Sequence, residues 1–211
     1  MANSKEAEER KKEILDVAEE LFTVKGYDST STTDILERVG IARGTLYYHF
    51  NSKEEILDAL IDRIMQGMVS NIHLALSDNM PALHKLISFV GAMKVDSAIG
   101  KEITDYAHKP QNALMHQKIQ NSLLAVLTPI ASEIIEEGIK EGSFSTSYPE
   151  EAAEMLLIYS SVVFDDMNEM AQAEWERKAA GFVFNMERLL GIKQGSLSEI
   201  INFINLAIPF Y

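Results

Sequence analysis

Hydrogen-bonding side chains crowd residues 43–49 of this 211-residue chain, which read Arg-Gly-Thr-Leu-Tyr-Tyr-His and are followed by Phe50. Leu46 and Phe50 stand four residues apart, so a helix here would turn both inward and leave the polar side chains outside. A dense set of hydrogen-bonding groups on one exposed helix face is suited to base edges and phosphates. The segment therefore predicts a short helix that enters the major groove of DNA.

A second short helix and a tight turn precede this segment and would hold it in place. Apolar residues four apart predict a helix over residues 32–39. Ser31 or Thr32 suits its N-cap, and Asp34 stands where the acidic partner of a capping box belongs. Gly40 suits the turn into the next helix. Together these elements predict a helix-turn-helix, whose second helix reads the DNA.

The remaining sequence predicts helices and no clear β-strand, so we expect an all-α fold. Residues 1–53 would form a three-helix DNA-binding domain, and residues 54–211 a larger helical domain. Gly26 and Gly191 suit the residue just after a helix, and Pro129 is expected to bend the helix that contains it. The other expected helices lie at about residues 5–25, 53–76, 96–107, 113–142, 149–170, 173–190 and 196–207, with one more opening at Pro81.

Composition narrows the class of protein. With 46% apolar residues, the chain can bury one or two cores. It has no cysteine, which rules out disulfides and thiolate metal sites and fits a reducing compartment. No N-terminal apolar segment resembles a signal peptide, and no apolar run is long enough to span a membrane. We therefore expect a cytoplasmic protein without membrane partners.

The charge balance is unusual for a protein that binds DNA. The net charge is −13, and residues 1–60 hold 8 Lys and Arg against 13 Asp and Glu. Phosphate binding requires positive groups and oriented donors at the contact surface, not a positive whole. We expect weak non-specific binding that falls steeply with added salt.

The motifs resemble those of the TetR/AcrR family of transcriptional repressors. Within residues 10–60 the chain carries a threonine at the first reader helix, a glycine turn, a basic residue and a glycine, then x-Leu-Tyr-x-His-Phe and a nearby lysine. The resemblance implies that residues 54–211 bind an unidentified small-molecule effector and dimerise, and that the homodimer binds a palindromic operator in double-stranded DNA. No cofactor is expected. Ala42 departs from the capping serine common in this family, and Leu36 from a small residue.

The same resemblance assigns roles at the DNA surface. Two threonines would contact the DNA backbone and groove from the first reader helix. An arginine, a glycine and a threonine would read bases from the second, where Tyr47 and His49 would bind phosphates, as would Lys53. The implied DNA-binding set is Thr32, Thr33, Arg43, Gly44, Thr45, Tyr47, Tyr48, His49 and Lys53.

The C-terminal helices carry candidate residues for a dimer interface and an effector pocket. An apolar stripe along the last long helices is expected to pair two subunits, with an intramolecular bundle as the alternative. A twofold dimer would set two readers about 34 to 36 Å apart, roughly one DNA turn. Methionine and aromatic side chains suit an adaptable pocket. The interface candidates are Leu156, Val163, Met167, Met170, Trp175, Phe182, Met186 and Leu189, and the pocket candidates are Met93, Tyr106, Met115, His116, Tyr159 and Phe164.

These observations favour a sequence-specific transcriptional regulator, a repressor that a small molecule releases from its operator. A helical small-molecule carrier or adaptor, in which the helix-turn-helix is only scaffold, is the alternative. An enzyme is disfavoured because the chain has no G-x-S-x-G, H-E-x-x-H, P-loop or G-x-G-x-x-G motif. The histidines lack the i, i+4 pairing of a helical metal site, so no metal is expected.

Overall fold

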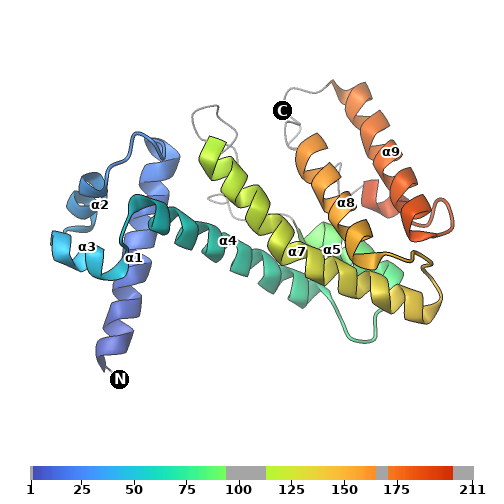
Figure 1. Ribbon diagram of the computed structural model, residues 1–211, viewed down its shortest axis with the longest axis horizontal. Helices are drawn as coiled ribbons and strands as arrows, with labels where there is room; N and C mark the ends of the chain where they lie inside the picture. The colour runs from blue at the N-terminus through green and yellow to red at the C-terminus, as the bar shows by residue number, and fades with distance from the viewer. Residues whose placement is uncertain (1, 94–112, 165–170, 202–211) are drawn as a thin grey trace. The chain divides into compact units, whose positions relative to one another are not determined.

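The computed structural model describes residues 2–93, 113–164 and 171–201, and every regular element within these ranges is an α-helix (Figure 1). This confirms the predicted all-α fold. The helix expected over residues 96–107 lies outside the described residues. Of the helix expected over residues 196–207, the structure describes residues 196–201, and residues 198–201 are helical. The helices are α1 (Ala2–Val24), α2 (Thr32–Val39), α3 (Arg43–His49), α4 (Lys53–Ala75), α5 (Ala82–Ala92), α7 (Ala113–Glu141), α8 (Pro149–Val163) and α9 (Gln172–Leu190).

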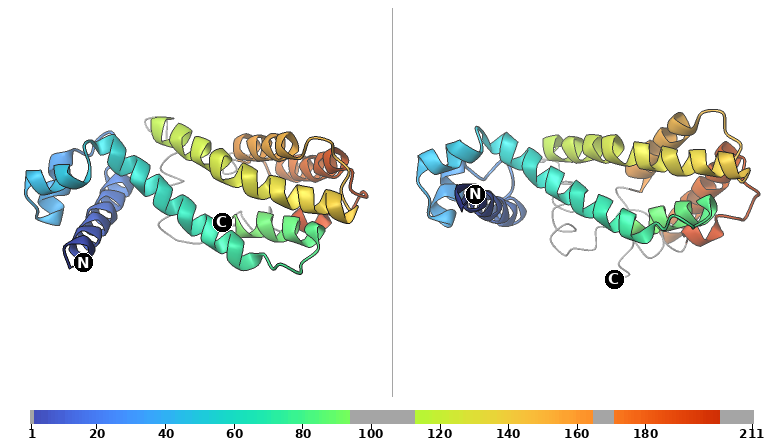
Figure 2. Two further views of the ribbon diagram at one scale, coloured as in Figure 1. Left: turned by 60° about the horizontal axis from the view of Figure 1, so that its bottom comes forward. Right: turned by 90° about the horizontal axis from the view of Figure 1, so that it is seen from below.

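The described chain divides into two compact units, and two long helices continue through the division. The first unit contains residues 2–65 and 113–122, and the second contains residues 66–93, 123–164 and 171–201. Helices α4 and α7 therefore contribute to both units, and Figure 2 shows each as an unbroken ribbon. The division falls inside α4, after residue 65.

Ion pairs and packing account for the place of that division. Arg63 of α4 pairs with Glu19 and, at 2.5 Å, with Asp16 of α1. Lys118 of α7 pairs at 2.6 Å with Asp58 in the second turn of α4. Pairs as exposed as these contribute at most about 1 kcal/mol each, so apolar burial dominates. The buried side chains of the first unit include Ile14, Ala18, Phe22, Ile35, Leu46, Phe50, Ile56, Leu57 and Leu60.

Helix α8 ends at Val163, several residues before the limit near residue 170 that its periodicity predicted. Phe164 caps it, with φ of −101° and ψ of 9°, and its N–H donates to the carbonyl oxygen of Ser160 at 3.1 Å. The Phe164 ring packs against Trp175 and Phe182 of α9, with centroids 6.4 and 5.5 Å away. These contacts between helices favour a shorter α8, and sequence periodicity does not report them.

Two close contacts organise the second unit, one at the end of α7 and one after α9. Gly138 of α7 leaves room for the ring of Phe144, which a β-carbon at residue 138 would approach to 2.2 Å. The carboxylate of Glu187 is buried and accepts hydrogen bonds from the N–H groups of Gly195 and Leu197 at 2.9 and 2.8 Å. Both oxygens of this buried charge are thus satisfied by the segment that follows α9. Within the described ranges, no helix is long and apolar enough to cross a membrane.

Candidate functional site

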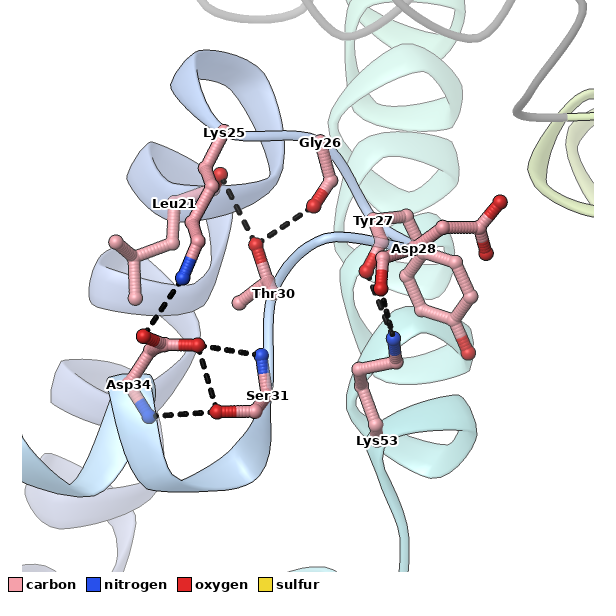
Figure 3. A network of polar contacts seen from close by, with 9 residues as sticks. All are labelled: Leu21, Lys25, Gly26, Tyr27, Asp28, Thr30, Ser31, Asp34 and Lys53. Carbon is pink, nitrogen blue, oxygen red and sulfur yellow. Dashed lines mark hydrogen bonds and ion pairs between the residues drawn. The ribbon is translucent and has the colours of Figure 1, made fainter.

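The start of α2 is fixed by a capping box, as the sequence predicted. The Ser31 hydroxyl accepts from the N–H of Asp34 at 3.1 Å, and the Asp34 carboxylate accepts from the N–H of Ser31 at 2.6 Å (Figure 3). Lys25 donates to the same carboxylate at 2.7 Å. The bonds from Lys25 and then Ser31 hold the pKa of the Asp34 carboxyl well below its usual range.

A buried threonine anchors the loop that leads into α2. Thr30 is 1% exposed, and its hydroxyl donates to the carbonyl oxygens of Gly26 at 2.6 Å and Leu21 at 3.3 Å (Figure 3). Gly26 has φ of 97°, the left-handed region predicted for it. The loop is thereby tied to the end of α1, and it delivers Thr32 and Thr33 to the first turn of α2. The N–H groups of such a turn have no partner within the helix and suit phosphate oxygens.

The turn between α2 and α3 has the predicted glycine geometry. Gly40 has φ of 75°, and its N–H and that of Ile41 both donate to the Leu36 carbonyl oxygen, at 2.9 and 3.2 Å. This closes α2 and redirects the chain within two residues. Ala42 stands at the N-cap of α3 and makes no side-chain bond. The start of α3 therefore lacks the side-chain cap that a serine would supply.

Helix α3 presents the predicted polar face to solvent. Leu46 and the following Phe50 are buried at 1% and 2% exposed, as their spacing predicted. On the outer side, the Arg43 guanidinium lies 5.9 Å from the ring centroid of Tyr47, within the range of a cation–π contact. Tyr48 is 78% exposed. The candidates Gly44, Thr45 and His49 complete this helix, with Gly44 exposed and the other two half-buried.

Arg43 is available for an external anion. Other arginines of the first unit are engaged: Arg38 pairs with Glu20, and Arg63 with two acids of α1. Arg43 forms no ion pair with any residue of the described ranges. Lys11 lies over the ring of Phe50, 5.8 Å from its centroid, at the end of α3. Local positive charge is therefore present beside the reader helix even though the chain as a whole is acidic.

Gly44 has free space where a side chain would begin. A β-carbon built on this residue would meet no heavy atom within 4 Å. A glycine inside a helix costs roughly 0.5 to 1 kcal/mol relative to alanine, so packing within the chain does not explain it. The open position suits close approach by an external surface.

Lys53 is placed differently from the other candidates. Its ammonium donates to the carbonyl oxygen of Tyr27 at 2.7 Å, lies 3.5 Å from that of Asp28, and sits 4.2 Å from the centroid of the Tyr27 ring (Figure 3). Burial lowers the pKa of the Lys53 ammonium, and the negative charge of Asp28 offsets only part of this effect. Sequence reasoning missed Tyr27; the only signal was an aromatic residue directly after the helix-ending Gly26.

The residues expected at a dimer interface fall into two groups. The chain itself buries Trp175, Phe182 and Met186, at 3%, 7% and 3% exposed, so these three side chains belong to its own core. Each helix of an α-helical pair can have an inner and an outer apolar face, and periodicity alone does not distinguish the two. Leu156, Val163 and Leu189 are half-buried, and Met167 and Met170 lie outside the described residues.

A different set of apolar side chains is exposed on α8 and α9. Met155, Ile158, Tyr159 and Val162 recur at helical spacing along α8 and are 61%, 42%, 43% and 62% exposed. Phe184 of the adjacent α9 is 43% exposed. We call these five residues the outer stripe. Exposed apolar surface of this extent at helical spacing is typical of a protein interface.

The effector candidates are distributed between the two units. Met115, which is buried, and His116 belong to the first, whereas Met93, Tyr159 and Phe164 belong to the second, and Tyr106 lies outside the described residues. The Tyr159 ring stacks on Phe182 of α9 with centroids 5.5 Å apart, and it also meets Phe164 edge-on. Tyr159 and Phe164, two of the expected pocket residues, thus pack against Phe182, which was expected at the interface. The described effector candidates do not all belong to one unit.

Known proteins match both parts of the chain. The family model for bacterial regulatory proteins of the tetR family matches residues 14–60, and the model for the tetracyclin repressor-like C-terminal domain matches residues 95–183. The chain is 27% identical over 165 residues to the uncharacterized HTH-type transcriptional regulator YhgD of Bacillus subtilis (strain 168), spanning 74% of this chain and 84% of YhgD. It is 26% identical over 155 residues to the HTH-type transcriptional repressor KstR2 of Rhodococcus jostii (strain RHA1), spanning 68% and 72% of the two chains.

Solved structures share the fold. The chain superposes on RolR in complex with its ligand resorcinol with a TM-score of 0.60 and 18% identity, over 98% of each chain. It superposes on a gamma-butyrolactone receptor with a TM-score of 0.58 and 15% identity, over 96% of this chain and 98% of the other. The two family models, the regulator sequences and the shared fold agree with the helix-turn-helix geometry, and the chain belongs to the TetR family of bacterial regulatory proteins.

Proposed function

We propose that this protein is a dimeric repressor that binds a palindromic DNA operator and is released from it by a small molecule. The observation that supports this most directly is the α2–α3 surface. An apolar stripe is buried beneath it, while hydrogen-bonding side chains and one open glycine occupy its outer face. Family membership supports regulation in general, and this geometry supports the specific DNA-reading role.

Roles at the DNA follow from the position of each side chain. Arg43 is suited to the O6 and N7 atoms of a guanine, and the Thr45 methyl group to a thymine. Thr32 and Thr33, with the free N–H groups of their turn, are suited to phosphates, as are Tyr47, Tyr48 and His49. The cation–π contact with Tyr47 restricts the Arg43 side chain before binding, which reduces the entropy lost when a base is bound.

The outer stripe is the proposed dimer surface. Two copies of α8 and α9 that meet through Met155, Ile158, Val162 and Phe184 would form a four-helix bundle across a twofold axis. Gly181 of α9 adds support, because a β-carbon there would meet nothing within 4 Å and the glycine would allow a partner helix to approach. Apolar burial between subunits would then fix the spacing of the two readers.

The effector is proposed to act through the helical part of the chain that follows the reader. RolR was solved with its ligand resorcinol, a small aromatic molecule with two hydroxyl groups, and the shared fold supports a small-molecule effector for this chain. Of the residues expected to contact an effector, Met93 and Phe164 of the second unit remain the proposed contacts. Because α4 belongs to both units, a ligand that prefers one arrangement of α4 could shift the population that binds DNA.

Selection from a random pool of DNA duplexes at low salt tests this proposal. The purified full chain should enrich an inverted repeat whose half-sites lie about one helical turn apart. An Arg43→Ala variant, which should remain folded because Arg43 is exposed, should lose that enrichment. If the folded dimer enriches no sequence, the carrier or adaptor alternative replaces the repressor. The enriched duplex then serves as the probe for ligands that release it.

A further inference from the structure

Lys53 begins α4, where a positive charge is unfavourable because the helix dipole presents its positive end there. The side chain turns away from its own helix to the loop between α1 and α2. Its ammonium donates to the Tyr27 carbonyl oxygen at 2.7 Å, lies 3.5 Å from the Asp28 carbonyl oxygen, and rests on the face of the Tyr27 ring (Figure 3). The negative ends of two peptide dipoles and a ring thus surround one charge.

The ring beneath this ammonium is itself held in place. Tyr27 is 7% exposed and meets Phe22 of α1 edge-on, with centroids 5.1 Å apart. The start of α4 is held separately, since the Ser52 hydroxyl accepts from the N–H of Glu55 at 3.1 Å and the Glu55 carboxylate accepts from the N–H of Asn51 at 2.6 Å. Lys53 therefore joins two anchored backbone segments. Swinging out to a phosphate would leave its carbonyl partners behind.

The loop that Lys53 holds is the same loop that delivers α2. Thr30, three residues after Tyr27, ties it to the end of α1, and Ser31 begins the capping box of α2. The next two residues, Thr32 and Thr33, carry the N–H groups proposed for phosphate binding. A displacement of the Tyr27 carbonyl would therefore move the first turn of α2 within a few residues.

We propose that Lys53 is a positioning residue that sets the first turn of α2 relative to the start of α4 and acts on DNA through α2, not as a phosphate ligand. This inference rests on the proposed DNA-binding function. It replaces the role that family resemblance implied for this lysine, and it makes the loop of residues 25–31 the link between α4 and the reader.

The test is Lys53→Met in the full chain, which keeps an unbranched apolar stem on the Tyr27 ring and removes the ammonium. Binding of the selected duplex is measured at several salt concentrations, under conditions where circular dichroism shows the variant fully folded. We expect the affinity to fall about tenfold at every concentration, which corresponds to about 1.4 kcal/mol. The slope of log K against log salt should not change, because the number of phosphates bound stays the same.

Lys12→Met is the matched control, since it removes the same charge from an exposed position on α1. Two results for Lys53→Met would overturn the proposal. A slope shallower by about 0.9 would mean that one phosphate contact is lost and that Lys53 is a direct ligand. An unchanged affinity would mean that Lys53 affects folding stability only.

Amide hydrogen exchange without DNA gives a second, independent readout. The N–H groups of Asp34 and Ile35, which donate to the side chain and the carbonyl oxygen of Ser31, should exchange faster in Lys53→Met than in the wild type and in Lys12→Met. Unchanged exchange there would refute the positioning role. Because this measurement needs no DNA, failure of the wild-type chain to select any duplex would count against the proposed function alone.

Discussion

Gly44→Ala should make the protein more stable and a weaker DNA binder at the same time. A β-carbon at this residue meets no atom of the chain within 4 Å, so the new methyl group causes no clash. Replacing a helical glycine by alanine stabilises by roughly 0.5 to 1 kcal/mol, and the position of Gly44 in the first turn of α3 favours the low end. At the DNA surface, however, the methyl group would hold the helix away from the base edges.

The loss of affinity should be at least tenfold, or about 1.4 kcal/mol, because several contacts lengthen together. Urea unfolding and titration of the selected duplex, on the same preparation, measure the two effects. Gly67→Ala is the matched control, since Gly67 is also an exposed glycine within a helix and with no neighbour within 4 Å of its β-carbon position. It should gain as much stability or more and bind DNA normally. Undiminished DNA affinity of Gly44→Ala would refute the assignment of α3 as the reader.

Three further outcomes follow from the structure. Val162→Glu should weaken dimerisation at least tenfold in analytical ultracentrifugation, because it places a charge in an apolar interface. The control Leu74→Glu, at a residue of α4 that is 86% exposed, should leave dimerisation unchanged. Equal effects of the two variants would contradict the assignment of the outer stripe as the dimer surface. The pKa of Asp34 is depressed in the folded protein, so its stabilising contribution is complete above about pH 4 and is lost as the pH falls through the folded pKa. Asp34→Asn should therefore lower the midpoint of urea unfolding at pH 7, and the midpoints of variant and wild type should converge in acid. Gly138→Ala should cost about 1 to 3 kcal/mol in urea unfolding, since its methyl group would overlap the Phe144 ring, and an unchanged midpoint would show that the ring moves freely.

The sequence by itself determined the reader because its signals are local. A serine and an acid three residues apart specify the capping box, a glycine specifies the left-handed turn at residue 40, and two apolar residues four apart specify which face of α3 is buried. Each signal acts through hydrogen bonds or packing within a few residues along the chain. The same locality explains why the ends of α4 and α9 fell close to expectation.

Tertiary structure alone decided the features that depend on distant partners. Lys53 finds its carbonyl acceptor 26 positions earlier in the chain, and no spacing rule connects the two. Along α8 and α9, apolar residues lie on more than one face, so only packing showed that Trp175 and Phe182 turn inward while Met155 and Val162 stay outside. Helix α8 likewise ends at Val163, next to Phe164, whose ring packs against α9. Helical periodicity states which residues share a face, whereas burial depends on which helix covers that face.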